Sequence, residues 1–193
     1  MPIPAPSPTV TPLDEERLLP EDEVIVSKTD LQGRITYANG TFRRISGYTR
    51  AELLGTPHNL IRHPDMPRCV FQFLWDELRA EREVFAFVKN LAKDGAYYWV
   101  LAHVTPSYDE HGKVVGYHSN RRTPARSALK VIEPIYATLC EVERGQVDLR
   151  SAVRVSMQAL VDTLRKAGVS YGEFVFSLIP EENEEGVHAA RNQ

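Results

Sequence analysis

A cation, an imidazole and a carboxylate stand within four positions, Arg62 to Asp65, in a run punctuated by two prolines. Proline fixes its own φ angle and pushes the preceding residue toward extended conformations, so His63 and Met66 should leave the helical region. Their neighbours then point in set directions, which suits a loop that faces a ligand. A second interpretation makes Asp65 the N-cap of a helix that begins at Pro67. The two are compatible if Asp65 caps while Arg62 and His63 face the ligand.

The elements that must position this loop are short. Alternating apolar and polar residues, with Gly and Asp in the connections, predict five strands over residues 24–29, 35–38, 84–91, 97–107 and 113–122. Helices are predicted over residues 41–46, 49–55 and 67–80, the second from a capping box formed by Thr49 and Glu52. These elements predict an α+β domain in which short helices lie on one face of a five-stranded antiparallel sheet. Such a sheet leaves a pocket between itself and its helices.

Composition divides the chain into four parts. Residues 1–20 are proline-rich and predict a disordered tail, and residues 21–124 contain the sheet domain. Residues 125–180 predict a helical extension, and residues 181–193 predict an acidic, flexible tail. An apolar stripe runs along the extension, made of Leu129, Ile132, Leu139, Val153, Met157, Leu160 and Leu164. We expect this stripe to pair two subunits; the alternative is that the helices pack on their own sheet.

Bulk properties exclude several classes of function. The net charge of −3 is close to balanced, so it offers no general attraction for nucleic acid, although Arg121, Arg122 and Arg126 form a small basic cluster. No apolar run approaches the ~20 residues that span a bilayer, and no signal peptide is evident, so we expect a cytoplasmic protein without a membrane span. Cys69 and Cys140 are interpreted as reduced thiols on apolar helix faces. No paired Cys and His spacing predicts a metal site.

Five segments carry a resemblance to a known family: ITYAN at 35–39, FRRISGYT at 42–49, LLGTPHNLIRHPDMP at 53–67, VKN at 88–90 and YYWV at 97–100. In this order they resemble the PAS sensor domain and, more narrowly, the flavin-binding PAS domain of bacterial aerotaxis receptors. The resemblance covers about residues 24–145, since VIEPIYATL at 131–139 is similar to the segment that follows the core there. It implies a domain that holds FAD noncovalently, senses oxidation state and signals through adjoining segments.

The resemblance implies eight candidate FAD-site residues, which are Asn39, Arg62, His63, Asp65, Trp75, Asn90, Tyr98 and Trp99. An isoalloxazine ring needs apolar walls and a few amide partners along its polar edge. Asn39 and Asn90 offer amides, and Trp75 and Trp99 would wall the ring. Each has a structural alternative: a helix cap for Asn39, a turn residue for Asn90 and core aromatics for the tryptophans.

Arg62 has the sharpest role under this resemblance. Its guanidinium would pair with the cofactor's phosphates or with negative charge on the reduced ring, and Asp65 would hold it in place. The alternative is an exposed Arg–Asp pair that contributes little. His63 would titrate near neutrality and couple oxidation state to protonation, or else it is a surface imidazole.

The predicted function is a redox- or oxygen-sensing module, not an enzyme, that passes the state of FAD to its C-terminal helices or to a partner of the chemoreceptor or kinase type. Aerotaxis receptors continue into a membrane anchor and a long signalling region for which this chain has no room, so a freestanding sensor or adaptor is expected. One alternative is a haem-binding PAS sensor with a histidine ligand; another is a cofactor-free PAS interaction domain. Cys69 lies in no photoreceptor-type cysteine motif, and no second nucleotide-binding fingerprint predicts a flavin enzyme.

Overall fold

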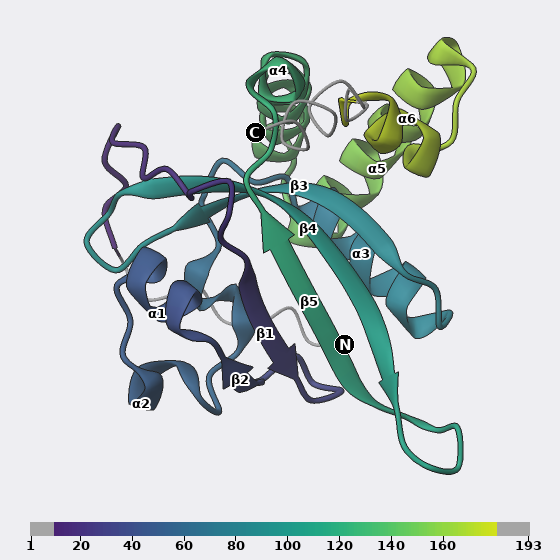
Figure 1. Ribbon diagram of the computed structural model, residues 1–193. Coiled ribbons are helices and arrows are strands. Elements are labelled where there is room, and N and C mark those ends of the chain that lie inside the picture. The colour runs from purple at the N-terminus through teal and green to yellow at the C-terminus, as the bar shows by residue number, and fades with distance from the viewer. Residues whose placement is uncertain (1–9, 181–193) are drawn as a thin grey trace, which may run out of the picture.

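The computed structural model describes residues 10–180 and is shown in Figure 1. Its strands are β1 (Ile25–Thr29), β2 (Ile35–Ala38), β3 (Val84–Leu91), β4 (Tyr97–Tyr108) and β5 (Val114–Arg122). Its helices are α1 (Gly40–Ser46), α2 (Arg50–Leu53), the 3₁₀ helix η1 (His58–Ile61), α3 (Arg68–Arg79), α4 (Arg126–Arg144), α5 (Leu149–Ala167) and α6 (Tyr171–Ser177). The strands form an antiparallel sheet in the order β2-β1-β5-β4-β3, which confirms the predicted α+β architecture.

Local signals account for the short helices but not for the start of α3. Thr49 and Glu52 form the predicted capping box at α2, and Asn39 caps α1 by accepting a backbone N–H. At α3 the cap position is occupied by Pro67, whose side chain makes no hydrogen bond. The prediction that Asp65 caps this helix is therefore wrong, because Asp65 lies two residues before the cap position.

One face of the sheet, here called the α3 face, packs against α1, η1 and α3. Val84 and Tyr117 of this face pack with Leu74 and Leu78 of α3. Phe42 of α1 lies on the same side, beside a β5 side chain. Because side chains alternate along a strand, the residues two positions apart on each strand share this face.

The opposite face, here called the α4 face, is covered near β3 and β4 by the C-terminal helices. The hydroxyl of Tyr136 in α4 donates to the backbone carbonyl of Phe87 at 2.9 Å, and its ring lies 6.2 Å from that of Trp99. Phe176 of α6 packs against Phe85, with 4.8 Å between the ring centroids. Strand β3 and the first half of β4 are thus covered on both faces.

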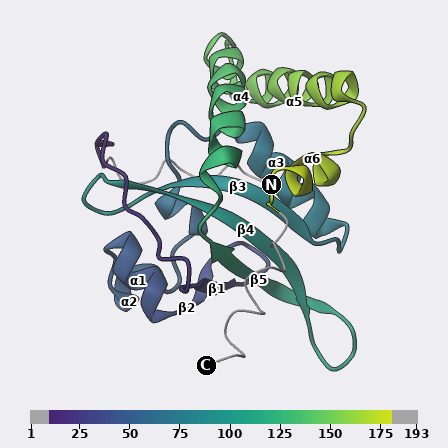
Figure 2. The same cartoon turned by 45° about the horizontal axis from the view of Figure 1, so that its top comes forward.

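The C-terminal helices gather beside β3 and α3, with α5 in contact with both α3 and α4 (Figures 1 and 2). Five residues of the predicted stripe are at most 9% exposed within the chain's own core: Leu129, Ile132, Leu139, Leu160 and Leu164. The helices therefore pack on their own domain, as the alternative held. Because the chain itself covers these five residues, they offer no open surface to a second copy, and the pairing of two subunits stays a prediction.

Residues 13–17 lie along the start of β4 and are hydrogen-bonded to it. The N–H of Leu13 donates to the carbonyl of Gly95 at 2.8 Å, and the N–H of Arg17 donates to the carbonyl of Tyr97 at 2.7 Å. Gly95 has a φ of +98°, and a Cβ built on it would lie 2.5 Å from the backbone oxygen of Thr11 and 3.0 Å from the Leu13 side chain. The N-terminal segment can therefore pass over the turn only because that residue is glycine.

The N-terminal part of the fold begins earlier than the sequence predicted. Leu19 is 4% exposed and belongs to the core, so the expectation of a disordered tail through residue 20 is wrong for residues 13–19. Residues 1–9 and the predicted acidic tail at 181–193 lie outside the described residues. Within residues 10–180, no helix combines the length and the apolar character that a bilayer crossing requires.

We expect Gly95→Ala to lower the free energy of unfolding by about 3 kcal/mol and Gly112→Ala by about 1 kcal/mol. Both glycines have positive φ, but a Cβ at Gly112 meets nothing within 4 Å, so the difference isolates the clash with the N-terminal segment. Urea unfolding of the two variants measures it. Equal losses would mean that residues 13–17 do not pack on this turn in solution.

Candidate functional site

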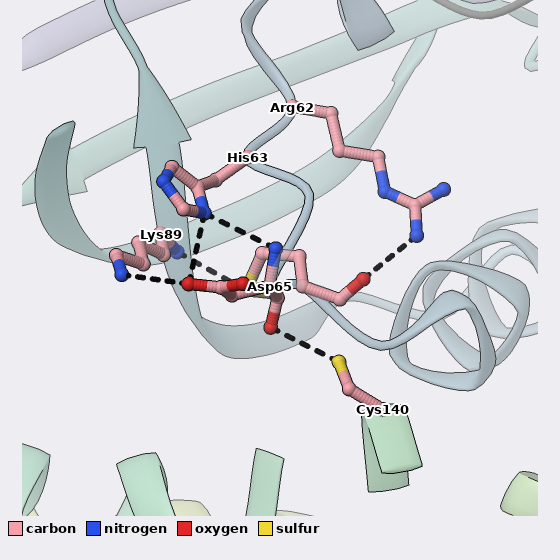
Figure 3. Close-up of polar contacts among 6 residues, drawn as sticks. Arg62, His63, Asp65, Lys89 and Cys140 are labelled. Carbon is pink, nitrogen blue, oxygen red and sulfur yellow. Dashed lines mark hydrogen bonds and ion pairs between the residues drawn. The ribbon is translucent and has the colours of Figure 1, made fainter. Parts of the chain in front are cut away.

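The loop from Arg62 to Pro67 runs along the free edge of β3. Arg62 forms an isolated antiparallel bridge with Asn90, and the N–H of Met66 donates to the carbonyl of His63 at 3.1 Å to close a turn. Because the loop lies at an edge, its side chains can reach either face of the sheet. Figure 3 shows the Arg62 and His63 side chains pointing to opposite sides of the loop.

The guanidinium of Arg62 is held by the loop and by α3. It donates to the carbonyl of Met66 at 2.7 Å and lies over the ring of Phe71, 4.9 Å from its centroid. Burial, and then charge repulsion from Arg68, lower the pKa of Arg62 to about 10, while the negative charge of Glu143 acts in the opposite direction. Arg62 is therefore a half-buried cation at neutral pH, held against the loop and α3.

Asp65 pairs with Lys89 of β3 and not with Arg62 (Figure 3). The Nζ and Oδ2 atoms are 3.1 Å apart, and the Asp65 side chain is 60% exposed, so this ion pair contributes under about 1 kcal/mol. The prediction that Asp65 holds Arg62 in place is wrong, and so is the alternative of an exposed Arg62–Asp65 pair. The carboxylate instead reaches outward, across the edge of β3.

His63 is buried, with a side chain that is 4% exposed. Its Nδ1 accepts the N–H of Asp65 at 3.1 Å, and its ring lies edge-on to Tyr97 at 6.0 Å. Burial, and then the charge of Lys89, lower the pKa of His63 to about 4, so the ring is neutral at physiological pH. The prediction that His63 titrates near neutrality is wrong. Tyr97 and Lys89 belong to the α4 face by alternation, so His63 lies away from the α3 face.

Four buried side-chain atoms on the α3 face have no hydrogen-bond partner among residues 10–180: Asn90 Nδ2, Tyr98 OH, Ser119 Oγ and Arg121 Nη1. Asn90 and Tyr98 are paired across β3 and β4, and Ser119 and Arg121 stand two positions apart on β5. A buried polar atom without a partner costs about 1–3 kcal/mol, so native proteins keep few of them. We call this set the polar cluster; it is the candidate ligand site.

Arg121 is the charged centre of the polar cluster. Its Nη2 donates to Ser27 Oγ at 2.6 Å and lies 2.6 Å from His58 Nε2, and the Phe42 ring lies 5.2 Å below the guanidinium. Among the described residues no carboxylate forms an ion pair with Arg121. Burial lowers its pKa to about 10, so the group still carries a positive charge at neutral pH. A buried cation without a counter-ion favours an anionic ligand beside it.

His58 on η1 completes this arrangement as a neutral acceptor. Burial, and then the charge of Arg121, lower the pKa of His58 well below its ordinary value. Since Nε2 faces the guanidinium, the ring must carry its proton on Nδ1. Burial also raises the pKa of the Tyr98 hydroxyl, which therefore remains a hydrogen-bond donor.

Asn39 has a structural role at the junction of β2 and α1. Its Oδ1 accepts the N–H groups of Val26 at 3.1 Å and Phe42 at 2.9 Å, and its Nδ2 donates to the carbonyl of Val24 at 2.8 Å. Three of the four hydrogen-bonding positions of the amide are therefore occupied. The structural alternative of a helix cap holds for this residue.

The two tryptophans lie on different faces of the sheet. Trp75 is half-buried on the α3 side, edge-on to Tyr117 at 5.4 Å and against the turn at Gly33. Trp99 lies on the α4 face beside Tyr136. A ligand on the α3 face can meet Trp75 but not Trp99, because the residue that follows Tyr98 must point the other way.

Sequence reasoning missed four residues of this site: Ser27, His58, Ser119 and Arg121. It grouped Arg121 with Arg122 and Arg126 as a basic surface cluster, whereas Arg122 is exposed and Arg126 pairs with Glu16 at 2.8 Å. The available signal was alternation along β5, which sets the side chains of residues 119 and 121 on the same face as Tyr117. No sequence pattern pointed to His58, because His58 contacts Arg121, 63 residues away, only in the folded chain.

A surface hollow of about 360 Å³ opens between β2, α1 and α2, and Asn39, Arg43 and Arg50 help to line it. It shares no residue with the polar cluster. The polar cluster lies apart from this hollow, on the α3 face. There, three neutral groups able to donate and one cation lie on three neighbouring strands, an arrangement that can bind acceptor atoms of a ligand and stabilise negative charge on it.

Comparisons with known proteins agree with this architecture. The pattern of the PAS fold family matches residues 35–121. The aerotaxis receptor of Escherichia coli K12 is 44% identical over 121 residues, which cover 63% of this chain and 24% of the receptor. The nitrogen fixation regulatory protein of Klebsiella pneumoniae is 31% identical over 105 residues, which cover 54% of this chain and 21% of that protein. The chain therefore spans only about a quarter of the length of these relatives.

Solved structures share the fold at low sequence identity. A light-oxygen-voltage domain studied with a flavin analogue aligns with a TM-score of 0.51 and 21% identity, covering 56% of this chain and 82% of that one. The light-state structure of the Aureochrome1 LOV photoreceptor aligns with a TM-score of 0.51 and 19% identity, covering 57% of this chain and 88% of that one. PAS domains of this kind are signalling modules and not enzymes. Residues 35–121 thus belong to the PAS fold family, and the domain around them is similar to part of the aerotaxis receptor.

Proposed function

We propose that this chain is a cytoplasmic redox- or oxygen-sensing module that binds FAD noncovalently between the α3 face and the helices α1–α3. The observation that carries the proposal is the polar cluster, with four buried groups that lack partners on the face where a ligand can lie. The similarity to the aerotaxis receptor, which extends over 121 residues, supports the same choice of ligand.

The chemistry of the donors fits the polar edge of a flavin. Asn90, Tyr98 and Ser119 can donate to its carbonyl oxygens and ring nitrogens, and Trp75 can contact the ring from the α3 side. Of the eight residues that the resemblance implied, Arg62, Trp75, Asn90 and Tyr98 remain in the proposed site. The other four have structural partners: Asn39 caps α1, His63 and Asp65 shape the loop, and Trp99 packs on α4.

When bound, FAD supplies a ring whose charge changes with its oxidation state. Arg121 and Arg62 stabilise the state that carries more negative charge, because Arg121 is a buried cation and Arg62 a half-buried one. In this proposal residues 21–124 are the sensing unit and residues 125–180 are the output element. A second copy of the chain, or a partner of the chemoreceptor or kinase type, receives the signal.

The haem and cofactor-free alternatives make different demands on the site. Both buried histidines use one ring nitrogen as an acceptor, His58 toward Arg121 and His63 toward the N–H of Asp65, so that the other nitrogen carries the proton, and His63 lies away from the α3 face. An axial ligand would also place a metal ion beside the Arg121 cation, which is unfavourable. A cofactor-free domain would bear the free-energy cost of four buried polar groups without hydrogen-bond partners, and no bound ligand would offset it.

We expect the purified protein to be yellow and to release about one FAD per chain on denaturation, because noncovalent binding leaves the cofactor free to dissociate. Absorbance spectra before and after dithionite, with chromatography of the released cofactor, measure this. A haem spectrum, or a colourless protein that takes up no added FAD, would refute the proposal.

Arg121→Met should weaken FAD binding by about 1.5–3 kcal/mol, the contribution of a charge-assisted hydrogen bond. The same change should leave the cofactor-free protein equally or more stable, because it removes a buried charge that has no counter-ion. Titration of FAD and urea unfolding measure the two effects.

Arg122→Met is the matched control, since Arg122 is the next residue and is exposed on the other face. It should change neither quantity by more than about 0.5 kcal/mol. Unaltered FAD affinity in a folded Arg121→Met protein would remove Arg121 from the site.

A further inference from the structure

The start of α3 is capped by a residue 74 positions away in the sequence. Glu143 of α4 accepts the backbone N–H of Cys69 through Oε1 at 3.1 Å. The first turn of α3 contains no acidic residue, and Pro67 offers no side-chain cap. A helix N-terminus carries unpaired N–H groups and partial positive charge, so a carboxylate placed there is stabilising. The C-terminal extension therefore supplies the N-terminal cap that the residues around the start of α3 do not provide.

The same carboxylate oxygen also holds α5. Ser156, which is fully buried, donates its hydroxyl to Glu143 Oε1 at 2.9 Å. One half-buried oxygen atom on α4 therefore joins the start of α3 to the middle of α5. Both hydrogen bonds are thus accepted by one atom, Oε1 of Glu143.

The loop that precedes α3 is attached to α4 at a second point. The thiol of Cys140, one turn before Glu143 on α4, donates to the backbone carbonyl of Asp65 at 3.2 Å (Figure 3). The negative charge of Glu143 acts to raise the pKa of Arg62, against the lowering by burial. The loop thus meets α4 at Cys140, one turn from the point where α3, α4 and α5 meet at Glu143.

We propose that Glu143 is a positioning residue that transmits changes in the loop Arg62–Pro67 to α5. The inference rests on the proposed function only in so far as the loop belongs to the flavin site. An anionic ligand group beside Arg62 draws its guanidinium away from the Met66 carbonyl, and the bonds that Glu143 makes to Cys69 and Ser156 respond at the adjoining start of α3. A change in the loop then alters the stability with which α5 packs on α4.

A mutant cycle in the full chain without ligand tests the link directly. Arg62→Ala perturbs the loop, and Glu143→Gln keeps an acceptor oxygen while removing the charge. We expect Arg62→Ala to change the rate of amide hydrogen exchange around Ser156 by about 3- to 30-fold. This range corresponds to the coupling energies that are typical between distant sites. In the Glu143→Gln background it should cause no further change.

Glu141→Gln is the control, because Glu141 is an exposed acid on the same helix. In that background the full effect of Arg62→Ala should persist. The proposal is overturned if Arg62→Ala leaves hydrogen exchange in α5 unchanged. It is also overturned if the change in exchange is the same with and without the Glu143 charge.

A second arm uses FAD as the probe. With FAD bound, reduction by dithionite should alter exchange in α5 of the natural chain but not of Glu143→Gln at equal flavin content. An equal response in both proteins would overturn the inference even though flavin binds. A chain that takes up no FAD would refute the proposed function, while the ligand-free cycle would still decide the role of Glu143.

Discussion

Strand β3 and the first half of β4 are covered on both faces, and each face packs against different helices. Asn90 and Tyr98 face α1–α3, while Phe87 and Trp99 face α4. Because side chains alternate strictly, a register slip of one residue would exchange the two sets at once. It would bring apolar rings against the polar cluster and leave the C-terminal helices against an amide and a hydroxyl. The pairing of β3 with β4 is therefore specified from both sides, and the positions of the helices follow from it.

The buried charge of Arg121 on the α3 face lowers the free energy of unfolding of the unliganded protein. A guanidinium with neutral partners, such as Arg121 with Ser27 and His58, loses hydration that no counter-ion restores. The depressed pKa values of Arg121 and His58 share this cause, since burial acts first on both. Proteins commonly retain such groups where binding needs them, at the expense of the unliganded fold. Apolar packing on both faces of the sheet offsets this cost.

Much of the fold could be predicted from local sequence, and the candidate site could not. The capping box of Thr49 and Glu52 and the five strands depend on residues close together in the chain, so propensity and alternation identify them. Asp65 was assigned to Arg62 because the two are neighbours in sequence, yet its partner Lys89 lies 24 residues away. Arg121 and Ser27 are 94 residues apart. Contacts of that kind depend on the completed sheet and leave no local pattern.

The cover on the α4 face has a consequence for how such a domain can be recombined with others. A cut after Thr123 would remove α4 and lay Phe87 and Trp99 open to water, and it would also take away the acceptor for the Cys69 amide. The sheet and helices α4 to α6 therefore form one folding unit. Another domain should be joined to it only after residue 178. Gene fusions that keep this unit whole retain a covered sheet, whereas fusions at the end of β5 create an aggregation-prone surface.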